Sequence, residues 1–491
     1  MKSKVSKVLS ILLSVVLVIS SFYLLYQVIR LNVLPSKFLF PLTIGVVVLD
    51  AIFILLLIYF SKNVVSKFVC IVLTLFICVA SCMGGYYISK TQNVLSNITN
   101  VAKHAKNTVS VIVKESSSIK NKSQLNGVSV GSLRLNEQGS KKALKELSNE
   151  GIVLNQTEYD SMTALLEAFY NGEVDSIIIN ESSRSQILDM EAYSNFDSNT
   201  RVVYQTSYKV KNNDSATSVS DITSKPFNVL ISGSDTRGGF DENGRSDVIM
   251  IATVNPKTHT ILLTSVPRDF YVTTACDAGD GCMQGALDKI THTGIHGTNT
   301  TKRTVEQLLG IEINYTFKVG FDTVTELVDV LGGVDVYVEP GYATTTSEFS
   351  VHEGVNHLNA QQALAFARER YSYTEGDRQR TKNQQQVLMG IVKEATKPSV
   401  ITNYAAIMDT MANTFSTTMS NEEITDLIKY QLNNNPTWKM EQYMVDGTGD
   451  TLMCAELGDA ASVMVPDQST VKMAKDKINA VLAGKSSEDV K

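Results

Sequence analysis

Three long apolar runs dominate the first ninety residues of the chain. They cover residues 8–29, 38–60 and 68–88, and Asp50 is the single charged residue inside them. A helix needs about 20 apolar residues to cross the hydrocarbon core of a bilayer. The pattern therefore predicts a membrane anchor of three transmembrane helices over residues 1–90. Because the first run is too long for a signal-peptide core and other runs follow it, we expect no cleaved leader.

The basic residues that flank these runs predict how the anchor is oriented. Positive charge is biased toward the cytoplasmic side of membrane proteins. The bias favours a cytoplasmic N-terminus, and three crossings then place the chain after residue 90 outside the cytoplasm. We therefore expect a multi-pass protein of the cell membrane. The two groups of flanking residues are Lys2, Lys4, Lys7, Lys62 and Lys67 on the inner side and Arg30, Lys37 and Lys90 on the outer side.

After a polar segment at residues 91–107, short β-rich runs alternate with stretches of helical periodicity. Residues 109–113 and 174–180 predict strands, and residues 161–170 predict a helix with apolar positions at helical spacing. This alternation predicts a small α/β accessory domain over residues 108–210. The segment contains no phosphate-binding loop and no catalytic cluster, so a ligand-binding or spacer role is all that it supports.

A second, larger α/β pattern follows a polar segment at residues 211–226, which we expect to be a linker. We assign residues 227–400 to a catalytic α/β domain and expect residues 401–491 to be a mostly helical extension, with a short strand near 443–445. The strands are predicted at residues 227–232, 247–254, 260–266 and 334–338, and the helices at 301–309, 323–331, 360–370 and 379–396.

Composition narrows the function classes. A net charge of −6 gives no overall attraction to nucleic acid, and an outside location removes DNA as a partner.

Cys276 and Cys282 can close a small disulfide loop in an oxidising compartment, and two free thiols are the alternative. His292 and His296 have the spacing of a helical metal pair. Gly294 between them, and the lack of a glutamate at the HExxH position, argue against zinc.

Arginine is unevenly distributed, and its distribution points to an anion site. Eight of the twelve arginines lie between residues 237 and 380. The planar guanidinium matches two oxygens of a phosphate or carboxylate, which the lysine ammonium does not. A solvated helix face with Glu369 and Asp377 as partners is the alternative for the densest cluster taken alone. That cluster consists of Arg368, Arg370, Arg378 and Arg380.

Acidic and basic residues also recur at the ends of three predicted strands. Asp235 lies just past the first strand, Arg245 and Asp247 lead into the second, and Arg268 and Asp269 follow the third. Strand ends of open α/β sheets are common ligand sites. Two aspartates can hold Mg²⁺ while arginines neutralise phosphate oxygens. Each aspartate alone is more often a turn former or helix cap, but together these residues predict a phosphate site.

These motifs, in this order, resemble the LytR–CpsA–Psr family, most closely its capsule-type members with three membrane spans and an accessory domain. The resemblance implies an α/β catalytic domain with a central mixed sheet flanked by helices, and it covers residues 226–400. The segments that carry it are residues 228–237, 245–247, 265–269, 288–292, 331–336, 367–370, 376–380 and 383–385.

The resemblance implies an Mg²⁺-dependent phosphotransferase, with Mn²⁺ as the alternative ion. Such enzymes move a capsular or related anionic polysaccharide from an undecaprenyl-pyrophosphate carrier to peptidoglycan and form a phosphodiester. The implied partners are the lipid-linked polysaccharide, peptidoglycan, membrane lipid and other capsule-assembly membrane proteins.

The family's site residues can be carried over by position. Asp235 and Asp247 match acidic residues associated with the metal and the pyrophosphate, and Asp235 or Asp377 is the candidate proton acceptor. The other matched positions are the arginines Arg245, Arg268, Arg368, Arg370 and Arg380, with Lys289, Arg378 and Gln384 as substrate-binding residues.

Two rival functions fit the same residues. A lipid pyrophosphate hydrolase would use water as the acceptor in the same site. A membrane sensor would bind the lipid-linked precursor and regulate capsule synthesis, although residues 1–7 are too short for a DNA-binding domain.

Overall fold

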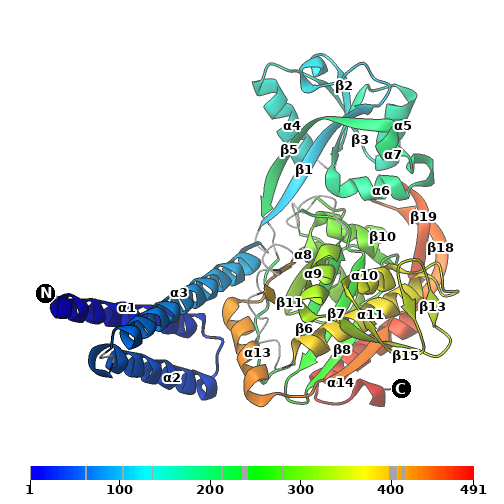
Figure 1. Ribbon diagram of the computed structural model, residues 1–491. Helices are drawn as coiled ribbons and strands as arrows, with labels where there is room; N and C mark the ends of the chain where they lie inside the picture. Colours follow the sequence, from blue (N-terminus) through cyan, green and yellow to red (C-terminus); the bar gives the residue numbers. More distant parts are fainter. Residues whose placement is uncertain are drawn as a thin grey trace. The chain divides into compact units, whose positions relative to one another are not determined.

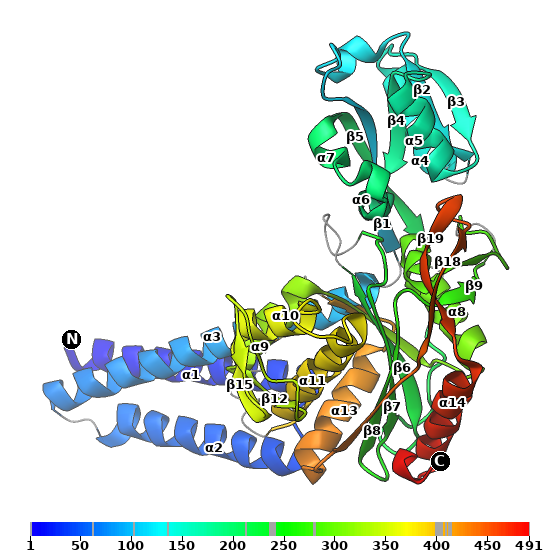
Figure 2. The ribbon, with the colours of Figure 1, turned by 90° about the vertical axis from the view of Figure 1, so that its right-hand side faces the viewer.

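The computed structural model describes most of the chain, and its contacts divide it into two compact units. One unit comprises residues 1–97, 395–412 and 420–436, and the other comprises residues 98–394, 413–419 and 437–491. The described residues are 2–60, 63–101, 104–134, 137–211, 214–234, 242–277, 281–397, 406–407, 410 and 415–490 (Figures 1 and 2).

The first unit contains the three apolar helices, which confirms the predicted runs. They are α1 (Lys2–Leu31), α2 (Ser36–Leu55), which continues as a π-helical turn over Leu56–Phe60, and α3 (Val64–Val101). Each contains a stretch long and apolar enough to cross a membrane. Asp50 on α2 accepts a hydrogen bond of 2.9 Å from the Ser21 hydroxyl on α1. The charged residue inside the apolar runs therefore has a polar partner on a neighbouring helix.

The accessory domain is built on a five-stranded sheet of order β3-β2-β4-β1-β5. Successive residues of a strand point to opposite faces, and β4 shows this clearly. Ile177 and Ile179 belong to one buried apolar cluster and Ile178 to another. Both faces are therefore covered by helices. The elements are β1 (His104–Lys114), β2 (Ser129–Leu133), β3 (Asn155–Tyr159), β4 (Ser176–Asn180), β5 (Thr200–Lys211), α4 (Glu137–Asn149), α5 (Met162–Asn171), α6 (Arg184–Asp189) and α7 (Phe196–Asn199).

The larger α/β domain has a mixed six-stranded sheet of order β16-β11-β6-β7-β8-β17. The pairs β6–β11 and β8–β17 are parallel, whereas β6–β7, β7–β8 and β11–β16 are antiparallel. This confirms the mixed α/β class. The strands are β6 (Phe227–Ser234), β7 (Val248–Asn255), β8 (Thr260–Val266), β11 (Tyr315–Gly320), β16 (Phe415–Thr417) and β17 (Lys439–Met444).

Helices from distant parts of the sequence cover this sheet. The helices α8 (Thr298–Leu309) and α14 (Gln468–Leu482) pack against sheet residues such as Leu230 and Leu262 in one buried cluster. A second cluster joins α9 (Phe321–Leu331), α10 (Ala360–Arg368) and α11 (Asp377–Ala395) with the strands β12 (Val334–Val338) and β15 (Gly354–Leu358). The remaining elements are β9 (Tyr271–Thr273), β10 (Leu287–Lys289), the 3₁₀ helix η6 (Ile290–His296), β13 (Thr344–Thr345), β14 (Ser350–Val351), α13 (Asn421–Asn434), β18 (Gly447–Cys454) and β19 (Asp459–Pro466).

The segment after residue 436 differs from the mostly helical prediction. The short strand predicted near residues 443–445 is present as β17, but β18 and β19 then form an antiparallel hairpin that was not predicted, which pairs Gly447 with Pro466 and Cys454 with Asp459. Its residues include alanine, leucine and methionine, which favour helices. The turn residue Gly458 has a φ of +67°, a conformation that glycine adopts without strain. The strands also contain glycine, threonine, valine and proline, which do not favour helices, and pairing between the strands holds both of them extended.

The segment predicted as a linker is packed against the larger domain where it is described. The backbone N–H of Thr217 donates to the carbonyl of Asn314 at 2.9 Å, and that of Val219 donates to the Tyr315 hydroxyl at 2.9 Å. Asp214 is buried and accepts a hydrogen bond of 2.6 Å from the Thr316 hydroxyl. Burial raises the pKa of Asp214 to about 6, although Thr316 and Lys302 oppose the shift.

We expect Asp214→Asn to change how stability depends on pH. Because the folded-state pKa is raised, the carboxyl favours folding when protonated, and that contribution is lost as pH rises from about 4 to about 6. The asparagine variant should therefore gain about 2–3 kcal/mol over the wild type between pH 4 and pH 7. Denaturant unfolding of the full-length protein in detergent at both pH values measures this difference, and a constant difference would contradict it.

Candidate functional site

The topology of the sheet brings the predicted strand-end residues to one edge. Because β7 runs antiparallel to β6 and β8, its start lies beside their ends, as the pairs Gly233 with Val248 and Ile249 with Val266 show. Arg245 and Asp247 precede β7, and Arg268 follows β8. The three side chains therefore meet although up to 23 residues separate them in the sequence.

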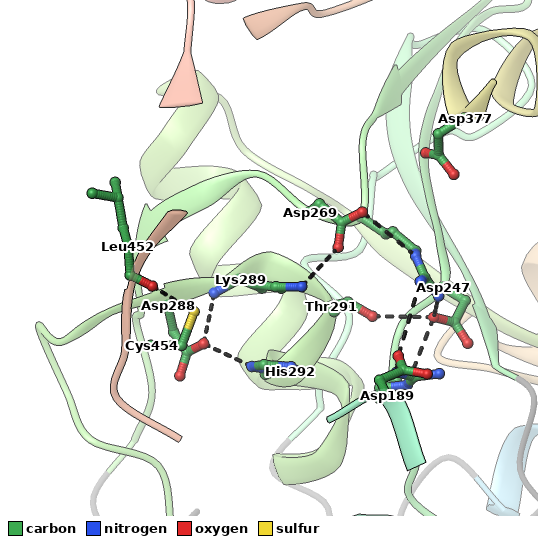
Figure 3. A network of polar contacts seen from close by, with 12 residues as sticks. Asp189, Asp247, Asp269, Asp288, Lys289, Thr291, His292, Asp377, Leu452 and Cys454 are labelled. Carbon is green, nitrogen blue, oxygen red and sulfur yellow. Dashed lines mark hydrogen bonds and ion pairs between the residues drawn. The ribbon is translucent and has the colours of Figure 1, made fainter. Parts of the chain in front are cut away.

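The centre of the site is an ion pair between Asp247 and Arg268. The Arg268 Nη1 donates to Asp247 Oδ1 at 2.8 Å, and the Thr291 hydroxyl donates to the same oxygen at 3.3 Å. The Arg245 Nε lies 3.8 Å from it. Figure 3 shows the contacts continuing through Asp269, whose Oδ1 lies 3.4 Å from the Lys289 Nζ. The pair is largely buried, with 12% of the Asp247 and 18% of the Arg268 side chain exposed.

Ser246 fixes the segment between Arg245 and Asp247. Its backbone N–H donates to the Thr291 carbonyl at 2.9 Å. Its hydroxyl shares hydrogen bonds with Ser232 at 2.9 Å and Thr301 at 3.0 Å. Neighbouring side chains of an extended segment point in opposite directions. Because the Ser246 side chain points into the protein, the side chains of Arg245 and Asp247 both point to the opposite side of the segment.

A second group of arginines comes from α10, α11 and the turn between them. Burial lowers the pKa of Arg380, and the nearby cations Arg268 and Arg370 add to this effect, whereas Asp377 opposes it through an ion pair. Burial also acts to lower the pKa of Arg268, but Asp247 and other carboxylates outweigh it and raise that pKa. A positively charged site of this kind stabilises bound oxyanions such as phosphate.

Other predicted site residues lie apart from this centre or outside the described residues. Arg378 forms an ion pair of 2.7 Å with Asp446 at the base of the β18–β19 hairpin. Arg368 is exposed at the end of α10, and Gln384 is partly buried on α11. Asp235 falls in residues 235–241, which lie outside the described part of the chain.

An acidic residue of the accessory domain joins the site, and the sequence did not predict it. Asp189, the last residue of α6, forms an ion pair with the Arg245 guanidinium, and its Oδ2 lies 4.0 Å from the Arg268 Nη2. Figure 3 shows Asp189 close to Asp247, and both carboxylates form ion pairs with Arg245 and Arg268. A single aspartate on a short helix carries no sequence pattern that could have revealed this contact.

The Asp247 carboxylate can serve as one ligand of a magnesium ion, but the described residues do not supply a full set of ligands. Among the described residues, the hydrogen bonds and ion pairs of the Asp247 side chain all use Oδ1, and none uses Oδ2. The described residues contain no group of three or more histidine, cysteine, aspartate or glutamate side chains placed to hold a metal. Mg²⁺ binds through one or two carboxylates with water and substrate oxygens as its other ligands, and Asp247 fits that mode.

The two histidines of η6 are paired with carboxylates. His292 lies 2.7 Å from Asp288 Oδ1, and His296 lies 3.0 Å from Glu456 Oε2. These contacts tie η6 to β10 and to the turn of the β18–β19 hairpin. Nearby, Cys276 and Cys282 form a disulfide and are not two free thiols.

We expect Gly294→Ala to displace the segment that carries Arg245 and Asp247. An added Cβ would lie 2.5 Å from the Gly244 carbonyl oxygen and from the Ser246 backbone nitrogen. Backbone atoms cannot move aside alone, so the free energy of unfolding should fall by about 1–3 kcal/mol. Denaturant unfolding measures this. Gly449→Ala is the control, because its added Cβ meets nothing within 4 Å, and equal losses in both variants would contradict the expectation.

Comparisons with known proteins match the chain to one sequence family and to several similar proteins. The sequence pattern of the LytR_cpsA_psr family matches residues 192–480. The chain is 31% identical over 241 residues to the polyisoprenyl-teichoic acid–peptidoglycan teichoic acid transferase TagU of Bacillus cereus, covering 48% of this chain and 76% of that protein. It is 34% identical over 203 residues to TagU of Bacillus subtilis, covering 41% of this chain and 63% of that protein.

Solved structures also resemble part of the chain. The crystal structure of Bacillus subtilis TagU aligns with a TM-score of 0.41 and 28% identity, covering 52% of this chain and 97% of that one. The protein gbs0355 of Streptococcus agalactiae aligns with a TM-score of 0.45 and 25% identity, covering 53% of this chain and 89% of that one.

Proposed function

Because the chain belongs to the LytR–CpsA–Psr family, we propose that it transfers a glycopolymer from a polyprenyl-pyrophosphate carrier to peptidoglycan. The product is a phosphodiester between the polymer and the peptidoglycan. The observation that carries this proposal is the convergence of Arg245, Arg268 and Arg380 around Asp247 at one edge of the sheet. Such an arrangement suits a substrate with several phosphate oxygens.

Charge stabilisation is the main chemical task of these residues. Phosphoryl transfer requires alignment and neutralisation of developing negative charge more than a covalent protein nucleophile. Arg245 and Arg268 contribute guanidinium groups to the phosphate oxygens, and Arg380 adds a further buried cation. The leaving group is the lipid phosphate, whose charge these cations stabilise. The proton of the sugar hydroxyl passes to Asp377 or Asp235, and the choice between them stays open.

Magnesium is the proposed cofactor, with Mn²⁺ as the alternative. Asp247 would hold the ion through Oδ2, together with substrate oxygens and, as the resemblance implies, Asp235. When bound, the ion would neutralise phosphate charge and thereby supplement the arginines.

We propose that the polymer is a capsular or related anionic polysaccharide carried on undecaprenyl pyrophosphate. The support is the three-helix anchor and the accessory domain, most of which precedes the family match at residues 192–480. The similar TagU proteins are named for teichoic acid, so teichoic acid is the alternative polymer. The distribution of basic residues supports an N-terminus in the cytoplasm and both α/β domains outside it.

The proposal predicts that Arg268→Ala strongly slows transfer. The substitution removes a guanidinium from the site and leaves Asp247 without its closest partner, so the rate should fall by about 10²–10³-fold. The assay combines full-length protein in detergent, a polyprenyl-pyrophosphate-linked saccharide, Mg²⁺ and peptidoglycan fragments, with mass spectrometry of the products. Arg303→Ala is the control, because Arg303 pairs with Asp277 on the exposed surface outside the site.

The products separate the proposal from its rivals. A phosphodiester-linked glycan that Arg268→Ala removes and Arg303→Ala retains supports the transferase. Release of lipid phosphate without glycan transfer, with peptidoglycan present, indicates a hydrolase. Precursor binding without turnover, unchanged by Arg268→Ala, would contradict the enzymatic function and favour a sensor.

A further inference from the structure

The accessory domain places a carboxylate on the arginines of the proposed phosphate site. Asp189 pairs with Arg245 and approaches Arg268, two arginines that also contact Asp247. The Asp189 side chain is 53% exposed, whereas the Arg245 side chain is 12% exposed. Asp189 therefore covers the site from its solvent side, in contrast to the largely buried Asp247.

The end of α6 that carries Asp189 is held in place on both sides. Within the accessory domain, Arg184 donates to Glu181 at 2.5 and 2.7 Å and to Asp197 at 2.9 Å, which fixes the start of α6. The next residue, Met190, packs against the buried Cys454, Leu457 and Val463 of the β18–β19 hairpin. The position of the Asp189 carboxylate is thus fixed by contacts at the start of α6 and by the packing of Met190 on the hairpin.

A second contact joins the accessory domain to the β18–β19 hairpin. The backbone N–H and the hydroxyl of Thr163, at the start of α5, donate to the Leu457 carbonyl at 3.2 and 3.1 Å. The accessory domain therefore meets the hairpin at α5 and at Met190, and it meets the arginines at Asp189. Farther from the site, Thr108 and Lys106 of β1 contact the Glu242 carboxylate of the larger domain. Apart from the packing of Met190 these contacts are polar, as is common for interfaces between domains that move relative to each other.

The Asp189 carboxylate accepts only some of the hydrogen bonds that the Arg245 and Arg268 side chains can donate. Within the described residues, the Nε atoms of Arg245 and Arg268 are buried and have no hydrogen-bond partner. A carboxylate has two oxygens, whereas a pyrophosphate offers more oxygens and more charge. Because guanidinium groups bind carboxylates and phosphates with the same geometry, the two ligands compete for the same donors.

We propose that Asp189 is an autoinhibitory carboxylate that occupies the pyrophosphate position and is displaced when the lipid pyrophosphate binds. The inference rests on the proposed function of the arginine site. The accessory domain then acts as a gate to the arginine site, because the end of α6 moves away from the site when Asp189 releases Arg245. The apparent affinity of the enzyme for its substrate is then reduced by the fraction of molecules in which Asp189 holds the arginines.

Binding of inorganic pyrophosphate to the full-length protein in detergent tests this proposal, with isothermal titration calorimetry as the measurement. We expect Asp189→Asn to bind pyrophosphate about three- to tenfold more tightly than the wild type, since a partly exposed ion pair is removed from the competition. The gain should shrink at high salt, which screens exposed charges. Asp189→Glu, which keeps the carboxylate, should remain near the wild type.

The matched control is Glu191→Gln. Glu191 is exposed two residues from Asp189, and its loss changes the net charge by the same amount. A gain in both variants would indicate a general charge effect and would overturn the proposal. Equal or weaker binding by Asp189→Asn, with reduced stability, would show a structural clamp instead.

Arg268→Ala distinguishes failure of the gate from failure of the proposed function. If this variant loses pyrophosphate binding while Asp189→Asn behaves like the wild type, the phosphate site stands and the gate is wrong. If Arg268→Ala binds pyrophosphate as the wild type does, or if no variant binds it, both the site and the gate are wrong.

Discussion

The ion pair between Asp247 and Arg268 is the interaction on which the rest of the site depends. Two charges withdrawn from water are stable only when each has a close partner and further hydrogen bonds. The Thr291 hydroxyl supplies such a bond to Asp247, and Asp269 lies beside the guanidinium. These contacts hold the Arg268 guanidinium beside Asp247 at the end of β8, where it can also face an incoming anion.

The sequence predicted the parts of the fold that follow local periodicity. The three apolar helices are confirmed, as is the mixed α/β class, because long apolar runs and strand-length patterns report burial directly. The hairpin at residues 447–466 was missed because the feature that defines it is the pairing of its two strands with each other. Contacts between distant segments leave no periodic signal, which is why the contact of Asp189 with Arg245 could not be predicted.

The arginine cluster shows both the strength and the limit of sequence reasoning. Its composition pointed to an anion site, and burial together with the nearby cations Arg268 and Arg370 lowers the pKa of Arg380. Arg378 and Arg380 are two residues apart on α11, however, and residues at that spacing do not share a helix face. Arg378 consequently pairs with Asp446, while Arg380 pairs with Asp377. Spacing along the sequence thus identified the cluster but not the direction of each side chain.

The order of strands in the larger sheet has a consequence for how the protein is made. Strand β17 at residues 439–444 pairs with β8, and α14 fills the apolar core between the sheet and α8. The accessory sheet, in contrast, is complete by residue 211. During synthesis the accessory domain can fold early, whereas Leu262 and its neighbours lack their cover until α14 emerges. The hairpin that receives Met190 is also synthesised late, so α6 acquires its docking surface only near the end of translation.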